Sequence, residues 1–336
     1  MGNLNSLRAL NRATILKQIL QVGDASRTEV AEQTGISKVA VTSIVNDLLK
    51  EGFLVEEGYS EGSAGRPAQK VHINPHLGWV LGIDVQPDEL RYGSSNIRGQ
   101  SFQVQDMPVQ HPSHVTERVL ACIEENVRQH PNNPLKYLCL GLAAPVDGQG
   151  QPYVPNGLPE LDLLQVKAQC DRLGTRLILE NDANLAAMAE QEIGAIQGER
   201  NFLVLLRRRP SGIGMGLFQN GQLCRGERGL AGEISLVKWS VGTQVMSIED
   251  LDPENQEVAL ANVISALGVS LDLNAIVIYE SPLIPETSQL KSRVRALLPQ
   301  RIGVLDSKLG RDATAAGALV RAVEALHLDL LAWPEF

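Results

Sequence analysis

Polar side chains gather in the middle of the chain, where a strand pattern gives way to a helical one. Segment 180–184 holds two acidic and two amide side chains, between an apolar strand pattern at 177–179 and a helical pattern at 183–193. In α/β proteins, ligands bind at the carboxyl ends of strands. The carboxylate of Asp182 could there accept a proton from a ligand hydroxyl. Capping of the following helix is the competing role, and the local pattern supports both equally.

A second set of polar side chains lies on one face of a helix predicted near the N-terminus. This helix begins after its N-cap, Ser37, and ends near residue 51. Its buried side is the apolar stripe of Val41, Ile44, Val45, Leu48 and Leu49. Its opposite face carries Lys38, Val39, Thr42, Ser43 and Asn46. A face of this kind can present side chains to base edges and phosphates of DNA.

Alternating glycines form a third candidate site at 211–216, directly after a strand pattern at 202–206. Glycines of this kind allow backbone amides to approach a phosphate closely. The spacing is not the dinucleotide-binding fingerprint, and a tight hairpin explains the glycines as well as a nucleotide site does.

The elements before the polar helix face are those of a helix-turn-helix. A first helix is predicted at about 7–21. Ser26 and Glu29 form a capping box that begins a second helix, and Gly35 ends it. The polar face then belongs to the third helix, which is the recognition helix in this arrangement.

The elements after this helix predict a wing. Strand patterns at 53–55 and 69–73 enclose a small, flexible loop. In the loop, Arg66 lies between a glycine and a proline, a setting suited to entry into a narrow minor groove. Residues 1–75 are therefore predicted to form a winged helix-turn-helix that binds double-stranded DNA, and the alternative is a small structural or protein-binding module. Its DNA-binding candidates are Ser37, Lys38, Thr42, Ser43, Asn46 and Arg66.

The longer remainder of the chain is predicted to be α/β. Buried strand patterns at 79–85, 138–142, 177–179 and 202–206 alternate with helical patterns, which are clearest at 116–129 and 183–193. A chain of 336 residues is long enough for two or three domains.

Composition places the chain among globular proteins of the cytoplasm. Hydrophobic residues make up 43% and charged residues 21%, and no signal peptide or membrane-spanning run is visible. The four cysteines are scattered, so we expect reduced core residues and neither disulfides nor a cysteine zinc site. The net charge of −9 comes from the larger part, because residues 1–70 carry eight basic and eight acidic side chains.

Several segments resemble the signatures of the ROK family, named for repressors, open reading frames and sugar kinases. The main matches are at 180–187, 211–216 and 229–234. Segments 141–147 and 309–317 resemble the family's early glycine-proline loop and its closing helix, so the resemblance covers nearly the whole chain. The N-terminal unit and its wing are similar to the repressor branch, which controls genes of sugar uptake and catabolism.

The resemblance implies a two-lobed actin-like ATPase (sugar kinase) fold for residues 76–336, with a sugar cleft between two α/β lobes. Asp182 matches the general base of the family's kinases. Asn156, Asn181 and Glu233 match residues that hold sugar hydroxyls. These four residues are therefore the candidates for binding a sugar or sugar-phosphate effector.

The sequence departs from the kinase pattern where the nucleotide would bind. The family's first phosphate loop has two glycines and a threonine after an aspartate, whereas Asp84 is followed by a valine, a glutamine, a proline and Asp88. Residues 279–281 place a tyrosine, a glutamate and a serine where the family has a glycine pair. We therefore expect no ATP and no other cofactor.

The zinc motif of the family is also missing. Its Glu-x-Gly-His sequence is replaced by one in which Leu236 stands for the histidine, and residues 237–256 contain no cysteine. We expect no metal. A ligand hydroxyl facing Leu236 would be unpaired, which favours a different ligand or weak sugar binding.

These features predict a transcriptional regulator of sugar-related genes, most simply a repressor that binds operator DNA as a homodimer or higher homo-oligomer and is not an enzyme. The alternative is a sugar kinase that uses Asp182 as its general base.

Overall fold

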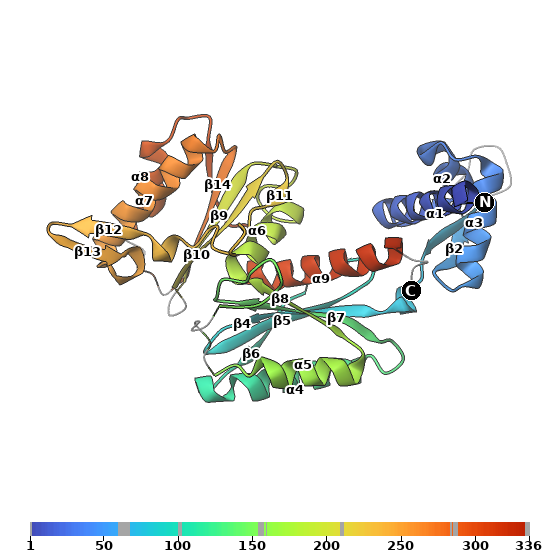
Figure 1. Ribbon diagram of the computed structural model, residues 1–336, viewed down its shortest axis with the longest axis horizontal. Helices are drawn as coiled ribbons and strands as arrows, with labels where there is room; N and C mark the ends of the chain where they lie inside the picture. Colours follow the sequence, from blue (N-terminus) through green and yellow to red (C-terminus); the bar gives the residue numbers. More distant parts are fainter. Residues whose placement is uncertain are drawn as a thin grey trace.

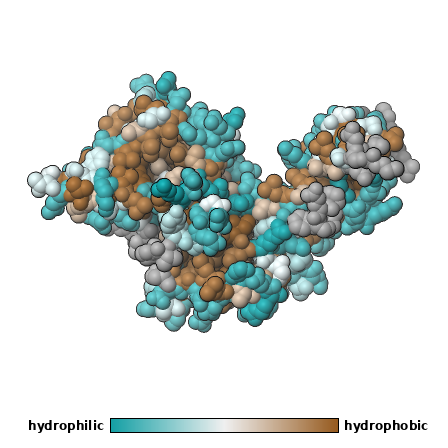
Figure 2. All heavy atoms as spheres, in the orientation of Figure 1, coloured by the Kyte–Doolittle hydropathy of each residue, from teal (hydrophilic) through white to brown (hydrophobic). Residues whose placement is uncertain are grey.

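The computed structural model describes residues 2–59, 68–99, 103–153, 158, 160–208, 212–282, 284 and 288–332. Figure 1 shows a small N-terminal unit at one end of the molecule, two larger lobes, and a long helix between them. The N-terminal unit and the lobes meet at a narrow waist in the space-filling view (Figure 2). In the part of the chain that the structure describes, no helix is both long and apolar enough to cross a membrane.

The N-terminal unit has the predicted order of a winged helix-turn-helix. Its elements are α1 (Gly2–Val22), β1 (Ala25–Ser26), α2 (Arg27–Thr34), α3 (Lys38–Lys50), β2 (Leu54–Tyr59) and β3 (Gln69–Ile73). β2 and β3 form the antiparallel wing. The short strand β1, which is not predicted from the sequence, pairs with the other side of β3.

Local sequence signals explain the boundaries of these helices. The Ser26 hydroxyl accepts a hydrogen bond from the amide of Glu29, and the Glu29 carboxylate accepts one from the amide of Ser26, so the predicted capping box is confirmed. α2 ends at Gly35 with a φ of 70°, a left-handed conformation that favours glycine. The four residues Val41, Ile44, Val45 and Leu48 are buried on the inner face of α3.

Each lobe is built around a five-stranded sheet of the same topology within the described residues. The first lobe contains β4 (Trp79–Val85), β5 (Glu89–Asn96), β6 (Gln105–Pro108), α4 (Val115–Gln129), β7 (Leu135–Leu142), α5 (Leu163–Leu173), β8 (Arg176–Asn181) and α6 (Asp182–Glu192). Its strand order is β6-β5-β4-β7-β8. β4, β7 and β8 pair in parallel, and β5 pairs antiparallel with both β4 and β6.

The second lobe repeats this plan. It contains β9 (Phe202–Arg208), β10 (Gly212–Gln219), β11 (Gln222–Leu223), α7 (Pro253–Ser270), β14 (Ala275–Glu280), α8 (Leu290–Leu297), β15 (Gly303–Asp306) and α9 (Ala313–Ala332). Its sheet order is β11-β10-β9-β14-β15. A separate hairpin, β12 (Lys238–Val241) with β13 (Gln244–Ser247), precedes α7 in the chain.

The last helix of each repeat lies between the lobes. α9 crosses the first sheet and packs along α6, whereas α4 and α5 cover the other face of that sheet (Figure 1). α6 in turn contacts β9 and β10 of the second sheet. Glycines make this close packing possible, because a Cβ on Gly216 would lie 2.4 Å from the carbonyl oxygen of Ala183 in α6. Gly214 and Gly216 therefore serve the packing of α6 on the hairpin of β9 and β10.

The cysteines agree in part with the expectation of reduced core residues. All four are free thiols, and Cys122, Cys139 and Cys170 are buried in the first lobe. Cys224 is half-buried instead.

Candidate functional site

The outer face of α3 is exposed along its length. Ser37 caps the helix, since its hydroxyl accepts a hydrogen bond from the amide of Ala40 at 3.3 Å. The side chains of Lys38, Val39, Thr42, Ser43 and Asn46 all lie on the surface. Val39 is 82% exposed.

One residue of this face, Asn46, is hydrogen-bonded to an arginine of α2 that also pairs with the wing. Arg27 donates a hydrogen bond from Nη2 to Oδ1 of Asn46 at 3.1 Å and forms an ion pair with Glu56 of β2 at 2.7 Å. Asn46 is therefore pre-oriented before any ligand arrives. The predicted wing residue Arg66 lies outside the described residues, so its contact with DNA stays a prediction.

In the first lobe, Asn181 rather than Asp182 caps α6. The Oδ1 atom of Asn181 accepts hydrogen bonds from the amides of Ala183 at 2.9 Å and Asn184 at 3.0 Å. Its Nδ2 donates to the carbonyl oxygen of Ala144 at 3.2 Å. Since the amide of Asn181 already makes these bonds, its first role is to hold the start of α6 in place.

Asp182 is buried against Arg208, which is not among the residues predicted from the sequence. Nη1 of Arg208 lies 3.4 Å from Oδ2 of Asp182 and 3.2 Å from Oδ2 of Asp84. Nη2 of Arg208 donates to the hydroxyl of Thr314 at 2.6 Å. The arginine comes from β9 of the second lobe, whereas Asp84 is on β4 of the first, so one guanidinium joins the two lobes.

In this cluster of Asp84, Asp182 and Arg208, burial and the oppositely charged neighbours shift the pKa values of Asp182 and Arg208 in opposite directions. Burial raises the pKa of Asp182 to about 6, although the neighbouring Arg208 lowers it, and the carboxylate of Asp84 raises it further. The Arg208 side chain is 9% exposed. Burial lowers the pKa of Arg208, but the charges of Asp84 and Asp182 raise it, and its pKa lies above the ordinary value. Removing one partner from a buried pair of this type costs about 3–5 kcal/mol, because the remaining charge is left without compensation.

Glu233 lies close to this cluster. Burial, followed by the charges of Asp182 and Glu249, raises the pKa of Glu233 to about 7. The other predicted effector residue, Asn156, lies outside the described residues. Leu236 is 58% exposed. The structure therefore brings Asn181, Asp182 and Glu233 to one region and adds Arg208, Asp84 and Thr314 to it.

The raised pKa of Glu233 makes stability depend on pH. The folded chain binds the Glu233 proton more tightly than the unfolded chain does, so this contribution is complete below the ordinary pKa of about 4.5 and is lost as pH rises to about 7. We expect the melting temperature of Glu233→Gln to rise relative to that of the natural chain between these two pH values. Melting curves of both proteins across this range test the expectation, and parallel curves would contradict it.

The turn after β4 is closed by a side chain. Nε2 of Gln86 donates to Oδ1 of Asp84 at 2.6 Å, and the buried Gln86 begins the tight hairpin to β5.

In the part of the chain that the structure describes, no three His, Cys, Asp or Glu side chains are grouped to hold a metal ion.

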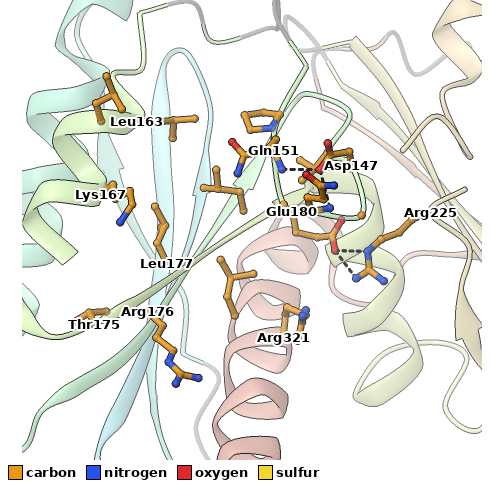
Figure 3. Close-up of a pocket in the computed structure, with 18 of the residues that line it drawn as sticks. Asp147, Gln151, Leu163, Lys167, Thr175, Arg176, Leu177, Glu180, Arg225 and Arg321 are labelled. Carbon is orange, nitrogen blue, oxygen red and sulfur yellow. Dashed lines mark hydrogen bonds and ion pairs between the residues drawn. The ribbon is translucent and has the colours of Figure 1, made fainter. Parts of the chain in front are cut away.

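A separate groove of about 790 Å³ runs along the outer edge of β8 (Figure 3). It lies between α5 and the turn at 146–152, and Arg225 and Arg321 approach it from the other side. Glu180 forms its link to the cluster: one carboxylate oxygen pairs with Arg225, and the other accepts hydrogen bonds from the amide of Asn181 at 3.1 Å and from Nδ2 of Asn184 at 3.0 Å. Among the described lining residues, Asn181, Asp182 and Glu233 do not appear.

Comparison with known proteins identifies relatives of this architecture. Residues 80–238 match the model of the ROK family. The xylose repressor of Caldicellulosiruptor bescii is 28% identical over 276 residues, which cover 80% of this chain and 69% of that protein. The chain spans about 60% of the length of several other curated relatives that it matches.

Solved structures share the fold. A ROK family transcriptional regulator, homolog of the E. coli MLC protein, aligns over 97% of this chain and 98% of its own, with a TM-score of 0.71 and 17% identity. The ROK hexokinase from Thermus thermophilus aligns over 74% of this chain and 99% of its own, with a TM-score of 0.58 and 21% identity. The α/β part thus has the fold of a ROK sugar kinase, and the alignment with the regulator extends over the N-terminal unit as well.

Proposed function

We propose that this chain, whose residues 80–238 match the ROK family, is a DNA-binding transcriptional repressor of sugar-related genes. The observation that carries this proposal is the exposed face of α3. Polar side chains and one exposed valine lie on this face, and the opposite face of the helix is buried. Ser37, Lys38, Thr42, Ser43, Asn46 and Arg66 are its proposed DNA contacts. Two copies of the chain would place two such helices on the half-sites of a palindrome.

The surroundings of Asp84 argue against a kinase. Gln86 turns back onto Asp84 in the place of a glycine-rich phosphate loop, and the guanidinium of Arg208 already neutralises Asp84 and Asp182. Tyr279 lies half-buried beside the charge of Arg208. Asp182 is nevertheless present, so ATP-dependent phosphorylation of a hexose, lost in Asp182→Asn, is the result that would favour a kinase instead.

The proposal is tested by sequencing the DNA that co-purifies with the full chain from its host. We expect enrichment of a palindromic sequence whose half-sites lie about one or more helical turns apart, because a symmetric dimer imposes that spacing. The same preparation of a Thr42→Ala, Asn46→Ala variant serves as the control. Random genomic fragments from both preparations would overturn the proposal.

We further propose that a sugar or sugar phosphate is the effector and binds at Asn156, Asn181, Asp182 and Glu233. Glu233 offers a carboxylate beside Asp182, and carboxylates are good acceptors for ring hydroxyls. A panel of sugars in a thermal-melting assay tests this, because a ligand that binds the native state raises the midpoint. A rise that disappears in Glu233→Gln is the expected result, and no rise with any member of the panel contradicts it.

A further inference from the structure

The C-terminal helix α9 connects the predicted effector site to the winged helix. It has 20 residues and is therefore about 30 Å long. Figure 1 shows it running from the junction of the two lobes to the N-terminal unit without a break. One continuous helix thus touches both regions to which the proposed function assigns ligands.

At its first turn, α9 contacts the guanidinium of Arg208, which pairs with Asp84 and Asp182. The Thr314 hydroxyl is fully buried, accepts a hydrogen bond from Nη2 of Arg208 at 2.6 Å and donates one to the carbonyl oxygen of Asp182 at 3.1 Å. This one hydroxyl therefore joins the start of α9 to the second lobe through Arg208 and to the start of α6.

Further along, α9 packs closely against the backbones of α6 and β4. A Cβ on Gly317 would lie 1.9 Å from the carbonyl oxygen of Leu185 in α6. A Cβ on Gly82 of β4 would lie 2.7 Å from the amide nitrogen of Leu319. Backbones packed this closely move together rather than deform, so a displacement of the first turn is carried along the helix.

The last turns of α9 meet the winged helix. Leu326 and Leu330 belong to the same hydrophobic core as Ile15 and Ile19 of α1, and α1 contacts α9 directly. Leu326 and Leu330 also line a cavity of about 350 Å³ together with Phe53 of the winged helix.

Polar contacts fix this end of α9 as well. Asp329 accepts a hydrogen bond from the hydroxyl of Tyr137 at 2.5 Å and pairs with Arg176 at 2.8 Å. Nearby, Arg98 of the first lobe pairs with Asp24 of the winged helix at 2.9 Å. The end of α9 and the winged helix are therefore both joined to the first lobe by polar contacts.

We propose that α9 transmits the state of the Asp182 cluster to the winged helix, with the Arg208–Thr314 contact as the link at the cluster end. The proposal rests on the proposed function for the identity of the two ligands. An effector that binds the Asp182 carboxylate competes with Arg208 for it. This competition changes the hydrogen bond from Arg208 to Thr314 in the first turn of α9. The displaced helix then alters the packing of Leu326 and Leu330 on α1, so the effector binds the two arrangements with different affinities.

Amide hydrogen exchange of the full chain, without DNA or effector, tests the coupling directly. The informative variants are Thr314→Val, which removes the hydroxyl and keeps the shape, and Arg208→Met. We expect both to change the exchange of amides in α1 and around Phe53, by about three- to tenfold, because each loses a hydrogen bond to a charged group at the far end of α9.

Arg207→Met is the matched control. Arg207 is the adjacent residue on β9 and is also a buried arginine, but it pairs with Glu257 and Glu280 inside the second lobe. We expect Arg207→Met to change amide hydrogen exchange only in the second lobe. If Thr314→Val leaves α1 unchanged, or if Arg207→Met affects α1 to the same degree, the coupling through α9 is overturned.

The result also separates this inference from the proposed function. Coupled exchange in a chain that shows no sequence-specific DNA binding would preserve the α9 inference and remove the proposed function. Specific DNA binding, with exchange in α1 unchanged by Thr314→Val, would preserve the proposed function and remove the α9 inference.

Discussion

Replacing Lys38 and Thr42 together by alanine is expected to weaken binding to the cognate operator by about a hundredfold or more, because each base contact in the major groove contributes roughly 1–3 kcal/mol. Both side chains are exposed in the first turns of α3, the part of a recognition helix that faces the bases. The buried face of α3 is untouched, so the melting temperature should stay the same. Fluorescence anisotropy with the selected operator measures the loss.

Lys50→Ala supplies the matched control for charge. Lys50 is also an exposed lysine of α3, but it lies in the last turn of the helix. Its loss should lower affinity for operator and random DNA by similar, small factors, because it removes only a general attraction to phosphate. Equal losses in Lys38→Ala and Lys50→Ala would mean that α3 does not bind DNA in the proposed orientation.

Gly317→Ala is expected to give the largest loss of stability from a single methyl group. The new Cβ would lie 1.9 Å from the carbonyl oxygen of Leu185 and 2.4 Å from its carbonyl carbon, and these are backbone atoms of α6 that cannot rotate away. Alanine favours a helix over glycine by about 1 kcal/mol, but overpacking of this severity costs about 3 kcal/mol or more. We therefore expect a net loss of about 2 kcal/mol or more in the free energy of unfolding, measured by denaturant titration.

Gly268→Ala in α7 is the control for this substitution. It is another helical glycine, but its added Cβ would meet the side-chain atoms Leu298 Cδ2 at 3.1 Å and Ile276 Cδ1 at 3.3 Å, which can move by small amounts. Its change should be small, within about 1 kcal/mol. If both variants were equally stable, the close packing of α6 on α9 would not be as tight as described.

The sequence predicts those elements whose boundaries depend on neighbouring residues. The capping box of Ser26 and Glu29, the left-handed Gly35 and the apolar stripe of α3 all involve contacts within a few residues, and each is found where it was expected. The boundary between the two domains at residues 75 and 76 stays a prediction. The family match and the fold of the two lobes agree with the interpretation of segments 180–187 and 229–234 as ROK signatures.

Features that depend on distant residues were missed. Arg208 pairs with Asp84, which lies 124 residues earlier in the chain, and with Thr314, which lies 106 residues later. The three consecutive arginines at 207–209 after a buried strand were the available signal, because a charge run at the end of such a strand needs partners. The hairpin of β12 and β13 was missed for another reason, since its strands are short, partly exposed and lack a strong apolar alternation.

Binding of the full chain to its selected operator, compared with a shuffled duplex of equal length and composition, tests the central claim most directly. The titration is carried out at salt concentrations between about 50 and 200 mM, because phosphate contacts weaken with salt and base contacts change less. The proposed function predicts binding to the operator about a thousandfold or more tighter at each concentration. Equal affinities for the two duplexes, or a preference that vanishes as salt rises, would contradict it.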